Sequence, residues 1–132
     1  MFLLRAFPFL ALVVIAYNIF FVLGATDIGA VVGNVRLPSG AVWTISAGDL
    51  LVISGLALLF VEIVSASSRA VSVVNHGLSL LVFVLCVVEF LLVPGAGTPE
   101  FLFITLMTLI DVVAGYTVSI GTARRDLALD RE

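Results

Sequence analysis

The sequence predicts an all-α membrane protein in which four transmembrane helices form an up-down bundle, with a short β-hairpin in the first outer loop. Of the 132 residues, 62% are hydrophobic and 11% are charged, and the mean hydropathy is +1.31. A soluble domain is about half apolar and about a quarter charged. Four apolar runs are each close to the ~20 residues that a helical span needs. We therefore expect a single membrane domain over residues 1–132.

Each apolar run is predicted to be one helical span. The predicted spans cover residues 6–24, 50–66, 71–93 and 101–121. Ser46 and Asp49 have the S-x-x-D spacing of a capping box before the second span. Thr98, Pro99 and Glu100 supply a cap, a first-turn proline and a carboxylate before the fourth. The first run also has features of a cleaved signal peptide, but its length and its polar residues favour a retained span.

The arginines predict the orientation of the spans. Those on one side are Arg5, Arg69, Arg124, Arg125 and Arg131, and only Arg36 lies on the other. Because cytoplasmic loops carry the excess of basic residues, both termini are expected in the cytoplasm. The expected location is the bacterial inner membrane, with residues 25–49 as an outer loop and 122–132 as a cytoplasmic tail.

The outer loop contains a hairpin pattern. Apolar residues alternate over 31–37 and again over 41–45, around a Pro38-Ser39-Gly40 turn. Trp43 suits the membrane interface. An isolated hairpin is marginal in water, so we expect it to lean on a neighbour. It is expected either to form a lid over the outer end of the bundle or to offer a strand edge to a partner.

Three carboxyl groups lie within the predicted spans: Glu62, Glu89 and Asp111. Ionisable residues inside a membrane are candidate functional sites. At 100° per residue, each carboxyl falls on the small or polar face of its helix. The candidate helix-packing residues on these faces are Gly55, Ser79, Thr108 and Gly115. Such faces are expected to pack against neighbouring helices, because small residues let backbones approach closely.

Depth separates the three carboxyl groups. Asp111 is roughly 15 Å from the outer end of its span, whereas Glu89 and Glu62 are each roughly 6 Å from a span end. A charged Asp at the bilayer centre costs about 2.5–3.5 kcal/mol. We therefore expect Asp111 to be protonated, hydrogen-bonded to hydroxyls or paired with another chain. Glu62 is expected either to reach the inner interface, to meet Arg69, or to join Asp111 and Glu89 in a ladder.

Secondary candidates lie at the inner interface. Asn75 and His76 begin the third span, and His76 titrates near neutral pH when unperturbed. No second histidine supports a metal site, and neither a metal nor a cofactor is expected. Cys86 is expected to be a buried, inert thiol. The sequence contains no catalytic motif and no basic stripe of the kind that binds nucleic acid.

The segment His76–Arg125 contains VEFLLVPG, LIDVVAGYTVSI and TARRD, and it resembles small bacterial four-helix inner-membrane proteins of unassigned function. That resemblance implies a membrane location without an activity. Four short spans in a small chain are also typical of the small multidrug resistance transporters, which carry a glutamate in their first span. Residues 6–24 contain no acid, so drug transport is not inferred.

Two functions remain open at this point. The favoured one is an accessory or assembly subunit of an inner-membrane complex, which would pack through the small-residue faces. The alternative is a small oligomeric transporter coupled to protons or cations, using Asp111 with Glu62 and Glu89. The expected partners are the lipid bilayer and other membrane subunits or further copies of the chain.

Overall fold

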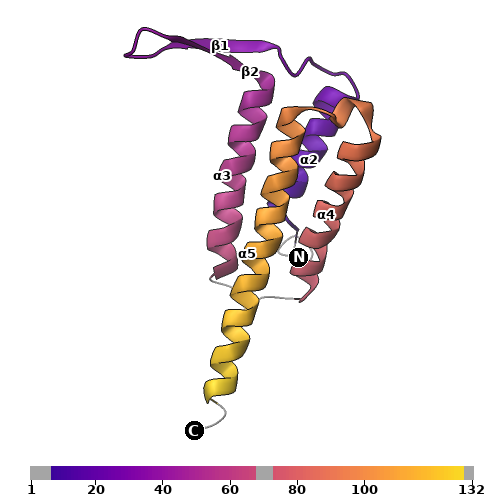
Figure 1. Cartoon of the computed structure of the whole chain (residues 1–132), viewed down its shortest axis with the longest axis vertical. Helices are drawn as coiled ribbons and strands as arrows, with labels where there is room; N and C mark the ends of the chain where they lie inside the picture. The colour runs from indigo at the N-terminus through magenta and orange to yellow at the C-terminus, as the bar shows by residue number, and fades with distance from the viewer. Residues whose placement is uncertain (1–6, 68–72, 130–132) are drawn as a thin grey trace.

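The computed structural model describes residues 7–67 and 73–129 as a mostly helical chain with one two-stranded antiparallel sheet. The elements in order are α2 (Phe9–Tyr17), a π-helix (Asn18–Val22), β1 (Val31–Arg36), β2 (Val42–Ser46), α3 (Ala47–Ser67), α4 (Val73–Leu92), a 3-10 helix (Pro94–Ala96) and α5 (Pro99–Leu129). Successive helices alternate in direction and lie side by side (Figure 1). Helix α5 packs against α2, α3 and α4, so it is the helix around which the bundle forms.

Two of the described helices are long and apolar enough to cross a membrane, namely Ala47–Ser65 and Pro99–Gly121. The apolar stretches Phe9–Val22 and His76–Leu92 are shorter. The structure therefore shows four helices, of which two have the length and composition of a span.

Several helix boundaries differ from the predicted ones, among them the start of α3 and the end of α5. Helix α3 begins at Ala47 rather than at residue 50, because Ser46 and Asp49 form the predicted capping box. The Ser46 amide and hydroxyl each donate to Asp49 Oδ2 at 2.8 Å, and the Asp49 amide donates back to Ser46 Oγ at 3.1 Å. Helix α5 continues to Leu129 through most of the predicted tail, since no proline interrupts it. Its 31 residues span roughly 46 Å at 1.5 Å per residue, and its end extends beyond the bundle (Figure 1).

The core of the bundle lies along α2 and the outer half of α5. Its most buried side chains are 0–1% exposed: Tyr17 and Leu10 of α2, Phe101 and Ile104 of α5, and Cys86 of α4. The Tyr17 ring lies 4.6 Å from the Phe101 ring and 5.2 Å from the Phe21 ring, between centroids. The run that contains Tyr17 and Asn18 is therefore an integral part of the packed bundle.

Large apolar side chains also cover the outside of every helix, and we call this surface the apolar perimeter. Its members are Leu12, Ile15, Ile19, Ile53, Leu56, Phe60, Val64, Leu81, Leu85, Val88, Leu106, Ile110 and Val113. Phe60 is 69% exposed and Val113 is 57% exposed. Large exposed apolar surfaces mark sites of contact with a membrane or with other proteins.

The predicted hairpin is confirmed. β1 and β2 are antiparallel, with Val35 opposite Trp43 and a bulge at Val32. The Gly40 amide donates to the Leu37 carbonyl at 2.9 Å, and Gly40 has a φ of +86°, which favours glycine. The hairpin extends sideways from the top of α3 and away from α4 (Figure 1). It therefore does not cover the ends of the other helices, and the expected lid is not formed.

Candidate functional site

Glu62 caps the N-terminus of helix α2. The α2 helix follows Pro8, which makes no side-chain cap. The backbone amides of Phe9 and Leu10 instead donate to Glu62 Oε1 and Oε2, at 3.3 and 3.4 Å. The first amides of a helix have no partner within it, and a carboxylate there is favoured by the helix dipole. Glu62 is 8% exposed, because its carboxyl turns toward α2 and not toward the surface of the bundle.

Asp111 lies buried on α5 between α3 and α4. Its carboxyl is 8% exposed and has a side-chain hydrogen bond with Ser79 of α4. It also interacts electrostatically with Glu62 and with His76. A carboxyl in this position thus has the hydroxyl partner expected from the sequence, and it obtains that partner within its own chain.

His76 is seated on Gly115 and joined to the end of α5. His76 Nε2 and Ser119 Oγ are 2.6 Å apart. The imidazole stacks on the Tyr116 ring, with centroids 5.4 Å apart and planes 19° apart. A Cβ on Gly115 would lie 2.7 Å from His76 Nδ1, so any larger residue there would force the imidazole to shift. Gly115 is therefore the reason that the imidazole can lie between α4 and α5.

These side chains form one group, the inner polar cluster, made up of Glu62, His76, Ser79, Asp111 and Ser119. It draws two carboxyl groups, one imidazole and two hydroxyls from three helices. Such a group can hold or pass a proton, and it can also fix the packing of α3, α4 and α5 through polar contacts that are specific in direction. Both uses are compatible with the contacts of Asp111 with Ser79, His76 and Glu62, and with that of His76 with Ser119.

Glu89 belongs to a different part of the bundle. Its nearest polar groups are Asn18, which hydrogen-bonds its carboxyl, and Tyr17 and Cys86, which interact with it electrostatically. Glu89 Oε1 is buried without a hydrogen-bonding partner among the described residues. Glu62 and Asp111 are therefore neighbours, whereas Glu89 lies apart from them beside Asn18.

Asn18 and Tyr17 mark the point where α2 becomes a π-helix. Asn18 Nδ2 donates to the Val14 carbonyl at 3.1 Å, and the Leu23 amide donates to the Asn18 carbonyl at 2.9 Å. The Tyr17 hydroxyl donates to the Gly95 carbonyl at 3.0 Å and lies 2.6 Å from Thr98 Oγ1. A π-turn widens a helix locally and often lies at a functional position. Here it places both polar side chains against α4 and α5.

Two threonine hydroxyls stabilise α5, one at its start (Thr98) and one buried within it (Thr108). Thr98 Oγ1 accepts the Phe101 amide at 3.2 Å, which is the cap predicted for this helix. Thr108 is 2% exposed; it donates to the Thr105 carbonyl at 2.7 Å and hydrogen-bonds the Cys86 thiol. Cys86 is buried and free. Its packing is therefore that of a small core side chain.

The predicted small-residue faces are used within the chain. A Cβ on Gly55 would lie 3.2 Å from Met107 Sδ and 3.4 Å from Val13 Cγ1. Gly55 thus allows α3 to meet α2 and α5, as Gly115 allows α5 to meet α4. These faces are occupied by neighbouring helices of the same chain and are not open to a partner.

Some candidate residues lie outside the described structure. Arg69 falls in the undescribed segment 68–72, and the side chain of Asn75 is not described. The expected pair of Glu62 with Arg69 is therefore not placed. Within the described ranges, no group of three or more His, Cys, Asp and Glu side chains is arranged to hold a metal ion.

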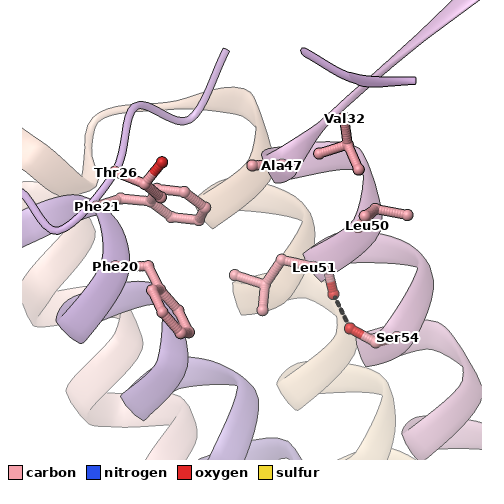
Figure 2. A pocket seen from close by; sticks show the side chains of 8 residues that line it. All are labelled: Phe20, Phe21, Thr26, Val32, Ala47, Leu50, Leu51 and Ser54. Atoms are coloured by element: carbon pink, nitrogen blue, oxygen red, sulfur yellow. Dashed lines mark hydrogen bonds between the residues drawn. The ribbon is translucent and has the colours of Figure 1, made fainter. Parts of the chain in front are cut away.

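An apolar groove lies at the other end of α3, beneath the base of the hairpin. It has a volume of about 320 Å³. Its lining comprises Phe20, Phe21, Thr26, Val32, Ala47, Leu50, Leu51 and Ser54 (Figure 2). The Ser54 hydroxyl already donates to the Leu51 carbonyl at 2.9 Å. The groove therefore presents apolar side chains from the π-helix, β1 and α3.

The sequence did not identify Tyr17, Asn18 and Ser119 as site residues. The first two were detectable as polar side chains inside an otherwise apolar run. Ser119 lies on the same small and polar face of its helix as Asp111, but its pairing with His76, 43 residues away, could not be predicted.

Comparison with protein-family models, curated proteins and solved structures finds no match to this chain.

Proposed function

We propose that this chain is an integral protein of the bacterial inner membrane that crosses it four times, and that it works as an accessory or assembly subunit of a membrane complex. The apolar perimeter carries the proposal. Surface of this kind costs about 25 cal/mol per Å² in water and nothing comparable among lipid chains. The arginine distribution supports cytoplasmic termini.

The Glu62 cap supports a membrane position for the short helix α2. Unpaired backbone groups are not tolerated in hydrocarbon unless the protein itself satisfies them. Because Glu62 accepts the Phe9 and Leu10 amides, α2 can begin below the membrane surface. A helix shorter than the bilayer then fits beside the longer α3 and α5.

The assembly role is supported by the polar groups of the bundle, because they already bond to one another within the chain. Asp111, Ser79, His76 and Ser119 are engaged with one another. The Gly55 face is filled by Val13 and Met107. A partner subunit would therefore meet the apolar perimeter, packing against side chains such as Phe60 and Leu85, and not the small-residue faces.

A second candidate function is favoured by the inner polar cluster. Glu62, Asp111 and His76 interact in the interior of the bundle, which is an arrangement found in proton pathways. In this alternative, Asp111 carries the proton or cation with Glu62, and Glu89 serves the opposite end. The chain would then be a small oligomeric transporter.

One comparison separates the two functions. Membranes from the native cell are solubilised in mild detergent, and the chain is followed on native gels with photo-crosslinkers at Phe60, Leu85 and Ile110. The assembly role predicts crosslinks to a different protein within a larger complex. It also predicts that the purified chain gives no proton flux in liposomes.

The transporter alternative predicts the reverse. The wild type would carry proton-coupled flux, and Asp111→Asn would abolish it while the variant stays folded. Asp27→Asn, at an exposed loop position, serves as the charge-matched control and should leave flux unchanged. A chain that does not sediment with membranes at all would contradict both functions.

A further inference from the structure

The hairpin has an unusual surface for a two-stranded sheet, because it exposes apolar side chains on both faces. Paired residues point to the same side, so Val35 and Trp43 share one face, while Arg36 and Val42 share the other. Val35, Val42 and Trp43 are 43%, 57% and 44% exposed. A two-stranded hairpin is marginally stable in water even with one face covered, so this one requires an apolar environment around it.

The base of the hairpin is fixed to the bundle, and this fixes the direction in which it extends. The Ala47 and Gly48 amides donate to the Ala30 and Ile28 carbonyls, each at 2.9 Å. A Cβ on Gly48 would lie 2.8 Å from Ile28 Cγ1, so the segment before β1 is held closely against the start of α3. From this base the strands run sideways across the helix axes, at the level of the outer helix ends (Figure 1).

The hairpin is also continuous with the apolar perimeter. Val32 lies above Leu50 at the edge of the groove, and Phe20 of the π-helix lies on the opposite wall (Figure 2). Val32, Leu50 and Phe20 are 59%, 44% and 48% exposed. An apolar surface therefore passes from the side of α2 and α3, through the groove, onto the hairpin without a polar break at these residues.

The charge of the hairpin complements a phospholipid surface. Residues 31–46 contain one cation, Arg36, and no Asp or Glu. They also contain Trp43, the one tryptophan of the chain. Tryptophan prefers the level of lipid headgroups, and arginine binds phosphate through a planar fork of donors.

We infer that the hairpin Val31–Ser46 lies in the outer headgroup region of the membrane, parallel to its plane, with Trp43 and Val35 among the upper acyl chains and Arg36 at the phosphates. The inference rests on the proposed membrane location. The occupant of the groove beneath Val32 is then the acyl chain of an outer-leaflet phospholipid. The hairpin extends the contact of this small chain with the lipid to one side of the bundle.

Quenching of the fluorescence of Trp43 reports the depth of the hairpin in the membrane. The full chain is reconstituted in vesicles of phosphatidylcholine and phosphatidylglycerol. Trp43 fluorescence is quenched in turn by phosphatidylcholine brominated near the carbonyl end, by the same lipid brominated near the methyl end, and by external iodide. The inference predicts about twofold stronger quenching by the shallow bromines than by the deep ones, since interfacial elements sit 5–10 Å into the membrane.

A matched variant places a tryptophan on the perimeter instead. The Trp43→Phe, Phe60→Trp double variant should be quenched more by the deep bromines than by the shallow ones. If this variant responds to lipid while Trp43 responds only to iodide, the hairpin lies in water and the inference fails while the proposed location stands. Protection of Trp43 from all three quenchers would mean that a protein surface, from a partner or a second copy, covers it, and this also overturns the inference. If neither tryptophan responds to brominated lipid, the proposed location itself is wrong.

Discussion

The helical bundle and the hairpin distribute their polar and apolar side chains in opposite ways. In the bundle, polar side chains from α3, α4 and α5 turn inward and find partners, while apolar side chains face outward. The hairpin has no interior, so its apolar side chains are exposed on both faces. The bundle therefore carries its own polar contacts, whereas the hairpin depends on what surrounds it. Changes inside the bundle should alter folding, and changes in the hairpin should alter only its own order.

The largest effect is expected at the Glu62 cap. Glu62→Leu leaves the buried Phe9 and Leu10 amides without an acceptor, and each such group costs about 1–3 kcal/mol. We expect the free energy of unfolding to fall by about 3 kcal/mol. Titration with sodium dodecyl sulfate in mixed micelles measures this loss. Glu62→Gln keeps an acceptor oxygen and should lose about 1 kcal/mol. Equal losses for both variants would show that α2 is not held by this contact.

The next effect concerns the seat of His76. Gly115→Ala places a methyl group 2.7 Å from His76 Nδ1, so the imidazole must shift away from Ser119 and Tyr116. Overpacking of this kind costs about 2 kcal/mol. Gly121→Ala lies on the same helix with nothing within 4 Å of the added Cβ. That control should be neutral or more stable in the same micelle titration, and a Gly115→Ala variant as stable as the control would contradict the described α4–α5 contact.

A smaller effect is expected at Tyr17. Tyr17→Phe removes the hydroxyl bonded to Gly95 and Thr98 while keeping the ring in place, at a cost of about 1 kcal/mol. Thermal unfolding in detergent, followed by circular dichroism, measures the change. Tyr116→Phe removes a hydroxyl from a half-exposed ring and should stay within about 0.5 kcal/mol of the wild type. If the two variants have the same stability, the Tyr17 hydroxyl does not join α2 to α5.

The smallest effect on the bundle is expected from the hairpin turn. Gly40 has a φ of +86°, and a Cβ there costs about 1–2 kcal/mol locally. Gly40→Ala should speed hydrogen exchange of the β1 and β2 amides and leave the exchange of α3 and α5 unchanged. Gly33→Ala, at a strand position with open space around the Cβ, is the control. Faster exchange in α5 would show that the two regions are not independent.

Local features of the fold followed from the sequence, and long-range pairings did not. The Ser46–Asp49 box, the Thr98 cap and the Gly40 turn depend on residues within a few positions of one another. The partner of Glu62 could not be predicted, because the Leu10 amide lies 52 residues away and any of several groups in a bundle can satisfy a carboxyl. The extent of α5 beyond residue 121 could not be predicted for a different reason, since apolar content marks a span and not the full helix.

The central claim is that the apolar perimeter faces lipid. It is tested most directly with single cysteines in a Cys86→Ala background, at Phe60 and Ile110 on the perimeter and at Ser39 in the hairpin turn. Intact vesicles are treated with a membrane-impermeant maleimide. We predict labelling at Ser39 from the outer side and no labelling at Phe60 or Ile110, although these side chains are 69% and 50% exposed on the isolated chain. Labelling of the two perimeter cysteines as fast as that at Ser39, without denaturant, would contradict the claim.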